Sequence, residues 1–139
     1  MNAPLYNMEI LRLAATVPFQ ERLADPMGTC EKRSPVCGSR VTVDVNLEDG
    51  RVSALGLLVR ACALGQASAG ILAAHVIGRT PAEIAEAHDQ LTAWLAEQGP
   101  APTWPGLDIF VPALPHRGRH ASIRLAFEAA AEAAQQAGR

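Results

Sequence analysis

Cys62 is the residue whose type and sequence context most favour chemistry. It stands where an alternating apolar pattern gives way to a helical one, and it is followed by a segment rich in small residues, Ala63-Leu64-Gly65-Gln66-Ala67-Ser68-Ala69-Gly70. A thiol at a helix start faces unpaired backbone N–H groups and the positive end of the helix dipole, which favour the thiolate that binds metal or attacks sulfur. The small residues would let another segment approach closely. The alternative is a buried cysteine that acts as a small apolar side chain.

The composition narrows the classes of protein to consider. The chain has 139 residues, three cysteines, a formal net charge of −2 and 4% aromatic residues. This length suits one domain, expected over residues 1–139. An odd number of cysteines without a secretory signal argues against a disulfide framework and favours metal binding or thiol chemistry in the cytoplasm. The charge and the few aromatic residues argue against nucleic-acid partners, and no apolar run is long enough for a membrane span.

Two β-strands are expected directly before Cys62. Apolar and polar residues alternate over 41–46, Asp49-Gly50 supplies a turn, and residues 51–59 form the returning strand of an antiparallel hairpin. Closing this hairpin would bring Cys37, which precedes it, close to Cys62, which follows it. By contrast, residues 17–38 show no period, and we expect a mobile loop at the site there.

Helical periodicity or composition predicts helices over residues 5–16, 62–77, 81–98 and 119–136. The third has the clearest start, because Thr80, Pro81 and Glu83 form a capping box with proline at the first helical position. Residues 107–114 are apolar and fit either a short helix or a packed turn. The last helix matters for the site because its start carries further polar residues.

The groups available for a metal or sulfur site are two cysteines and three residues near the last helix start: Cys37, Cys62, His116, His120 and Ser122. Two thiolates with one or two imidazoles would suit a tetrahedral zinc ion. The spacing contains no CxxC pair, so it does not specify a metal by itself. Arg117 and Arg119 could hold an anion or a persulfide near the thiols by their charge. Cys30 is expected to be an incidental loop thiol.

In their order, these motifs resemble the iron–sulfur cluster assembly scaffold family, which comprises IscU, SufU and the N-terminal domain of NifU. The matching segments are Pro35-Val36-Cys37-Gly38, the hairpin, the segment from Cys62 to Ala69 and a last helix beginning near His120. The long segment before the last helix is more similar to the SufU branch. The resemblance implies an α+β fold of SufE/NifU type, with a small antiparallel three-stranded sheet and helices packed on one face. The third strand would then come from 17–38 or another segment without a clear pattern.

The resemblance also implies a site in which three cysteines and an aspartate hold a nascent cluster, or a zinc ion and transferred sulfur. Cys37 and Cys62 match the first two cysteines, whereas Ser39 stands in place of the aspartate. The third cysteine's place falls on Ser122 in one alignment and on His120 in another. Because histidine is a good ligand for zinc and for clusters, the expected metal ligands are Cys37, Cys62 and His120, with Cys62 as the candidate persulfide acceptor.

The implied function is that of a non-enzymatic scaffold or sulfur acceptor that carries an iron–sulfur cluster or zinc. Its expected partners are a cysteine desulfurase and apo-protein acceptors, with neither nucleic acid nor membrane. Two alternatives stay open because two of the four ligands are replaced. One is a degenerate scaffold-fold binding module without metal. The other is a metal-free thiol or persulfide enzyme, in which Cys37 resolves a disulfide with Cys62.

Overall fold

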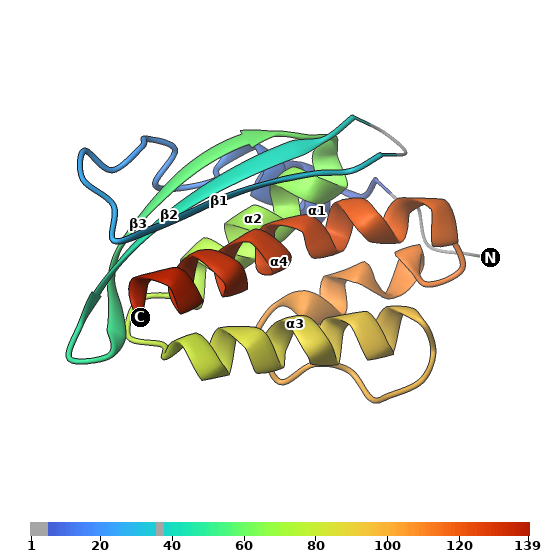
Figure 1. Cartoon of the computed structure of the whole chain (residues 1–139). Helices are drawn as coiled ribbons and strands as arrows, with labels where there is room; N and C mark the ends of the chain where they lie inside the picture. The colour runs from blue at the N-terminus through green and yellow to red at the C-terminus, as the bar shows by residue number, and fades with distance from the viewer. Residues whose placement is uncertain (1–5, 36–37) are drawn as a thin grey trace.

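The computed structural model describes residues 6–35 and 38–139, which form helices around one three-stranded sheet (Figure 1). The elements are α1 (Met8–Ala15), β1 (Gly28–Arg33), β2 (Arg40–Glu48), β3 (Arg51–Arg60), α2 (Ala63–His75), α3 (Pro81–Leu95), the 3-10 helices η1 (Leu107–Ala113) and η2 (Arg117–Arg119), and α4 (His120–Ala137). The sheet order is β1-β2-β3, and both pairs are antiparallel. This confirms the predicted α+β class. Within the described residues, no helix has the length and apolar character needed to cross a membrane.

The β2–β3 hairpin confirms the strand prediction. Asp49 and Gly50 have φ angles of 54° and 76°, the left-handed conformation that a tight two-residue turn requires at both positions. At the other end of the hairpin, Arg40 pairs with Arg60. The chain therefore enters β2 and leaves β3 at the same end of the sheet, and Cys62 follows directly.

Strand β1 lies within residues 17–38, where we expected a mobile loop and which we also named as one possible source of the third strand. Gly28–Arg33 pairs antiparallel with β2, so the third strand comes from this segment and Cys30 lies in a strand. The strand escaped detection because Gly28 alone among its residues is buried, so no alternating apolar pattern marks it. A Cβ atom on Gly28 would overlap the carbonyl oxygen of Ala133, which shows how closely β1 lies on α4.

The hydrophobic core lies between the sheet and the helices. Helices α2 and α4 contact the sheet, α1 packs on α2, and α3 packs on α4 and forms a further layer away from the sheet (Figure 1). The valines predicted to face the core, at positions 41, 43 and 45, are fully buried. The capping box of α3 is confirmed, since the Glu83 amide donates to the Thr80 hydroxyl and the Thr80 amide donates to the Glu83 carboxylate, both at 3.2 Å.

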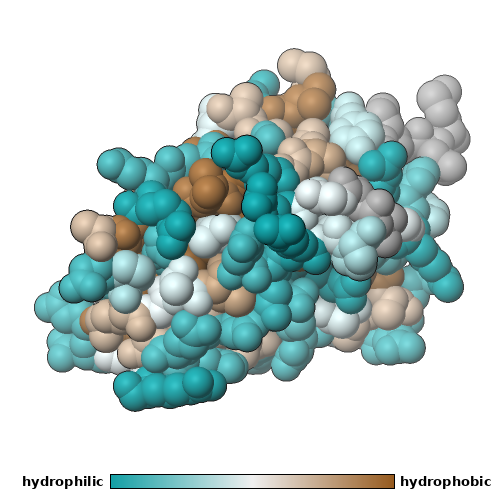
Figure 2. All heavy atoms as spheres, turned by 45° about the horizontal axis from the view of Figure 1, so that its top comes forward, coloured by the Kyte–Doolittle hydropathy of each residue, from teal (hydrophilic) through white to brown (hydrophobic). Residues whose placement is uncertain are grey.

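The opposite face of the sheet is fastened to the segment before β1 by Asp44. Its carboxylate accepts hydrogen bonds from Arg22 Nε at 2.6 Å, from the Thr29 hydroxyl at 2.7 Å and from the Leu23 amide at 3.0 Å. Burial by itself would raise the pKa of Asp44, but these hydrogen bonds together hold that pKa below its ordinary value. Figure 2 tilts this side of the molecule forward and shows a largely hydrophilic surface with separate hydrophobic patches.

Candidate functional site

Cys62 is the N-cap residue of α2, as predicted. Its backbone is extended, its carbonyl accepts the Gln66 amide at 2.9 Å, and no side chain caps the helix start. The thiol is free and the residue is half-buried. A half-buried cysteine at an uncapped helix start is placed to meet a metal ion or another sulfur atom with the backbone N–H groups of the first turn beside it.

The small residues after Cys62 let α4 approach α2 closely. A Cβ atom on Gly65 would lie 3.4 Å from the backbone oxygen of Ser122, and the Ser68 hydroxyl donates to the Ile123 carbonyl at 2.6 Å. The close approach that we predicted from the small side chains is thus confirmed. As a result, Ser122 packs against the first turn of α2, the turn that Cys62 begins.

His120 is the first residue of α4 and is only 8% exposed. Its Nε2 atom lies 3.0 Å from the carbonyl oxygen of Ala113 and 3.1 Å from that of Leu114. Because a carbonyl oxygen can only accept, Nε2 carries a proton and donates it to both. In the neutral ring the lone pair is then on Nδ1. His120 therefore ties the end of η1 to the start of α4 and keeps one ring nitrogen for a further partner.

The placement of Cys37 lies outside the described residues, so its closeness to Cys62 stays a prediction. The flanking chain is defined: the Ser34 amide donates to the Ser39 carbonyl at 2.8 Å, which joins the two ends of the β1–β2 connection. This connection is at the end of the sheet from which β3 leads to Cys62. Among the residues that the structure describes, no three His, Cys, Asp or Glu side chains group as a metal site.

Cys30 lies in a different environment from Cys62. Its thiol donates to a carboxylate oxygen of Glu132 at 3.4 Å, and Lys32 lies 2.7 Å from the same carboxylate. Burial, followed by the hydrogen bond to Glu132, raises the pKa of Cys30 to about 11. The Cys30 thiol therefore stays protonated at neutral pH, whereas a metal ligand must be a thiolate.

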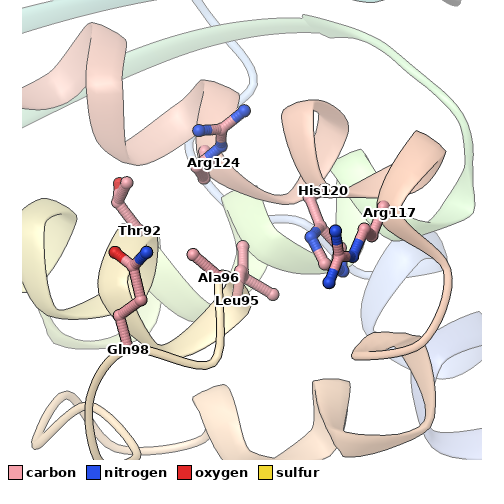
Figure 3. A pocket seen from close by; sticks show the side chains of 7 residues that line it. All are labelled: Thr92, Leu95, Ala96, Gln98, Arg117, His120 and Arg124. Carbon is pink, nitrogen blue, oxygen red and sulfur yellow. The ribbon is translucent and has the colours of Figure 1, made fainter.

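A cavity of about 410 Å³ between the end of α3 and the start of α4 was not predicted. Its polar lining comes from Thr92, Gln98, Arg117, His120 and Arg124. In Figure 3 the side chains of Arg117 and His120 overlap at one end of the labelled group, and Arg124 lies further along α4. One sequence signal was available, since Arg124 interrupts the apolar run between Ile123 and Leu125.

Comparisons with known proteins bear on this arrangement. Neither a scan against models of protein families nor a search of curated proteins gives a match. Among solved structures, the N-terminal part of a nitrogen-fixing NifU-like protein from Brucella abortus shares 38% identity, covers 96% of this chain and 94% of its own, and has a TM-score of 0.91. A protein described as an iron–sulfur cluster assembly scaffold for the SUF system of Fervidobacterium islandicum shares the fold, at 17% identity over 91% of this chain and 93% of its own, with a TM-score of 0.84.

The first of these likenesses decides the family, because identity at this level extends over nearly the full length of both chains. The second adds the fold alone. The order of motifs around Cys62 and the last helix points the same way. The chain belongs to the iron–sulfur cluster assembly scaffold family of IscU, SufU and the N-terminal domain of NifU.

Proposed function

We propose that this protein is a cytoplasmic scaffold that carries a nascent iron–sulfur cluster or a zinc ion as cargo on Cys37, Cys62 and His120. The observation that carries the proposal is the fixed ring of His120. Histidines that bind metals almost always donate their other ring N–H to a carbonyl or carboxylate, which sets the tautomer and the orientation of the ring. The donation from Nε2 to Ala113 and Leu114 is a contact of this kind.

The two cysteines suit the same cargo for separate reasons. Cys62 stands at an uncapped helix start, where the backbone favours negative charge on sulfur or on a cluster. Cys37 belongs to the connection between β1 and β2, which leaves the sheet at the end that also leads to Cys62. Thiolates and an imidazole are common ligands of zinc, and thiolates with histidine also occur at iron–sulfur clusters. The donor types therefore fit either cargo.

We propose that Cys62 takes part as an acceptor and receives sulfur that a cysteine desulfurase has already mobilised. The Cys62 thiolate would bond to the outer sulfur of a persulfide on the desulfurase, and the original sulfur–sulfur bond would break with that enzyme's cysteine leaving as a thiolate. This exchange involves no net oxidation. Apo-proteins that accept the finished cluster would be the second class of partner.

The first test is elemental analysis of the protein purified without chelator, followed by titration with zinc and iron. We expect one metal ion or one cluster per chain in the wild type, and loss of this loading in Cys37→Ala and in Cys62→Ala. Cys30→Ala is the matched control, because the Cys30 thiol is engaged by Glu132 and should not contribute. Loading that persists in Cys62→Ala would contradict the site.

A second experiment decides between His120 and Ser122 as the third ligand. We expect His120→Gln to weaken zinc binding by about tenfold to a hundredfold, whereas Ser122→Ala should leave it nearly unchanged, since a neutral hydroxyl is a weak ligand. His116→Gln serves as the control, because His116 is an exposed histidine of the same segment. Unchanged affinity in His120→Gln would remove His120 from the proposed ligands.

A degenerate scaffold without metal is the second candidate function. It is favoured by Ser39 at the place of the expected aspartate and by the lack of a third family cysteine. A folded wild-type protein that takes up neither zinc nor iron would support it over the cargo-bearing scaffold. Reversible crosslinking of Cys37 to Cys62 under mild oxidant would then point to the thiol enzyme instead.

A further inference from the structure

The cavity between α3 and α4 is lined by positive charge without a compensating carboxylate. Arg117 and Arg124 both line it, and its other polar groups are Thr92, Gln98 and His120. Arg117 comes from η2 and is exposed, whereas Arg124 lies in the second turn of α4 and is half-buried. Arginines presented from two elements to one cavity are suited to an anion, because each guanidinium offers several donors in a planar fork.

Five arginines pair with carboxylates, and the other six, Arg117 and Arg124 among them, form no ion pair within the described residues. Arg22 pairs with Asp44 at 2.6 Å, Arg40 with Glu31 at 3.4 Å and Arg79 with Glu83 at 3.3 Å. Within residues 6–35 and 38–139, neither Arg117 nor Arg124 forms an ion pair. The Nε atom of Arg124 is also buried and has no hydrogen-bond partner among these residues. A buried donor without a partner costs free energy, so this atom of Arg124 does not contribute to the stability of the fold through a hydrogen bond.

The start of α4 adds to the positive potential. This helix has 18 residues, no side-chain hydrogen bond caps its N-terminus, and no acidic residue lies in its first turn. The helix dipole therefore places positive charge at the end of α4 that begins with His120, with Arg117 just before the helix and Arg124 in its second turn. Each of these features would lower the free energy of an anion in the cavity, and no acidic lining residue opposes them.

We propose that this cavity binds a small oxyanion, a carboxylate or a phosphate group, through the guanidinium groups of Arg117 and Arg124. Its volume of about 410 Å³ lies within the range of small-molecule sites, so there is room for an organic anion that bears such a group. The amide of Gln98 lies on the α3 side of the cavity and would supply a further donor (Figure 3). The site needs no metal and goes beyond the proposed scaffold function.

Isothermal titration calorimetry with sodium phosphate and, separately, with sodium acetate tests this proposal, with ionic strength held constant by sodium chloride. We expect one anion per chain. Arg117→Gln and Arg124→Gln should each weaken binding by about tenfold or more, because a hydrogen bond to a charged group contributes that much. Arg12→Gln is the control, since Arg12 is exposed on α1 and does not line the cavity. Far-UV circular dichroism checks that each variant is folded.

The two anions separate the sources of the ligand. Binding of phosphate alone indicates a phosphate ester, and binding of acetate alone indicates a carboxylate, and either result supports the site if both arginine variants weaken it. If Arg124→Gln fails to fold, the exposed Arg117→Gln decides the outcome. The proposal is overturned if neither anion binds at about 10 mM, or if Arg12→Gln weakens binding as much as Arg117→Gln. The same anion titration of Cys62→Ala distinguishes the cavity from the proposed metal site. We expect Cys62→Ala to bind the anion as tightly as the wild type does.

Discussion

The sheet side of the molecule and the region where α2 and α4 begin use the same residue types in opposite ways. On the sheet side, the Cys30 thiol donates a hydrogen bond to Glu132, and Arg22 forms an ion pair with Asp44. Near the helix starts, Cys62 caps α2 and Arg117 and Arg124 line a cavity, and none of the three has a carboxylate partner among the described residues. Cysteine and arginine thus stabilise the fold where a partner is built in, and are available for ligands where it is not.

This difference is related to the free-energy cost of burying a polar group that has no partner. Burying a charged or polar group without a partner is unfavourable, so evolution of a stable fold alone would pair it or replace it. The buried Nε atom of Arg124 bears such a cost, whereas Arg117 is exposed and half-buried Cys62 has its thiol free. Four measurements test this difference between the two regions.

The largest effect should come from Asp44→Ala on the sheet side. It removes a buried carboxylate that accepts from Arg22, Thr29 and the Leu23 amide, so we expect a loss of about 3 kcal/mol in the free energy of unfolding. Urea unfolding measures it. Asp25→Ala is the control at an exposed acidic residue and should change stability by less than about 0.5 kcal/mol. Equal effects of the two variants would contradict the structural role of Asp44.

The reactivity of Cys30 should reveal its raised pKa of about 11. In a Cys37→Ala, Cys62→Ala protein, the rate of alkylation by iodoacetamide should rise about a hundredfold from about pH 8 to about pH 10, because the thiolate fraction rises by that factor. The same protein unfolded in urea, with a thiol near its ordinary pKa of 9.0, should show a rise of only about tenfold. The same pH dependence in the folded and the unfolded protein would mean that Glu132 and burial do not raise the pKa of the Cys30 thiol.

Acid should weaken the sheet side through the lowered pKa of Asp44. The unfolded chain binds a proton at the ordinary pKa of 3.8, and the folded chain binds it only at a lower pH. The stability contributed by ionised Asp44 is therefore fully present above about pH 4 and is lost as the pH falls through the folded-state pKa. Urea unfolding at several pH values should show a smaller acid loss in Asp44→Asn than in the wild type. If the free energy of unfolding falls equally with acid in both proteins, ionised Asp44 does not contribute to the pH dependence of stability.

The smallest effect is expected for Lys32→Met. Lys32 lies 2.7 Å from the Glu132 carboxylate, but the two side chains are 31% and 48% exposed. Solvent screens such a pair, so the free energy of unfolding should fall by less than about 1 kcal/mol. Urea unfolding of Lys32→Met and Asp44→Ala under the same conditions compares their free energies of unfolding. A loss as large as that of Asp44→Ala would show that solvent exposure does not weaken the Lys32–Glu132 pair relative to the Arg22–Asp44 pair.

Much of the fold could be predicted because it depends on local patterns. Alternation over 41–46 with the Asp49-Gly50 turn predicted the hairpin, and Thr80 with Glu83 predicted the start of α3. Both signals act over a few residues, through side-chain periodicity and capping hydrogen bonds. Strand β1 could not be found in this way, since it is held by pairing with β2 and by contact with α4 rather than by an apolar pattern of its own.

The candidate site likewise has features that follow from local sequence and features that follow from contacts between distant segments. That Cys62 begins a helix and that small residues follow it could be predicted, because both depend on the order of residues along one segment. Three contacts follow from the packing of the helices: Ser122 meets the first turn of α2, Nε2 of His120 donates to two carbonyl groups, and Arg117 and Arg124 line one cavity with the end of α3. These contacts join segments far apart in the chain, and their geometry follows from how the helices pack.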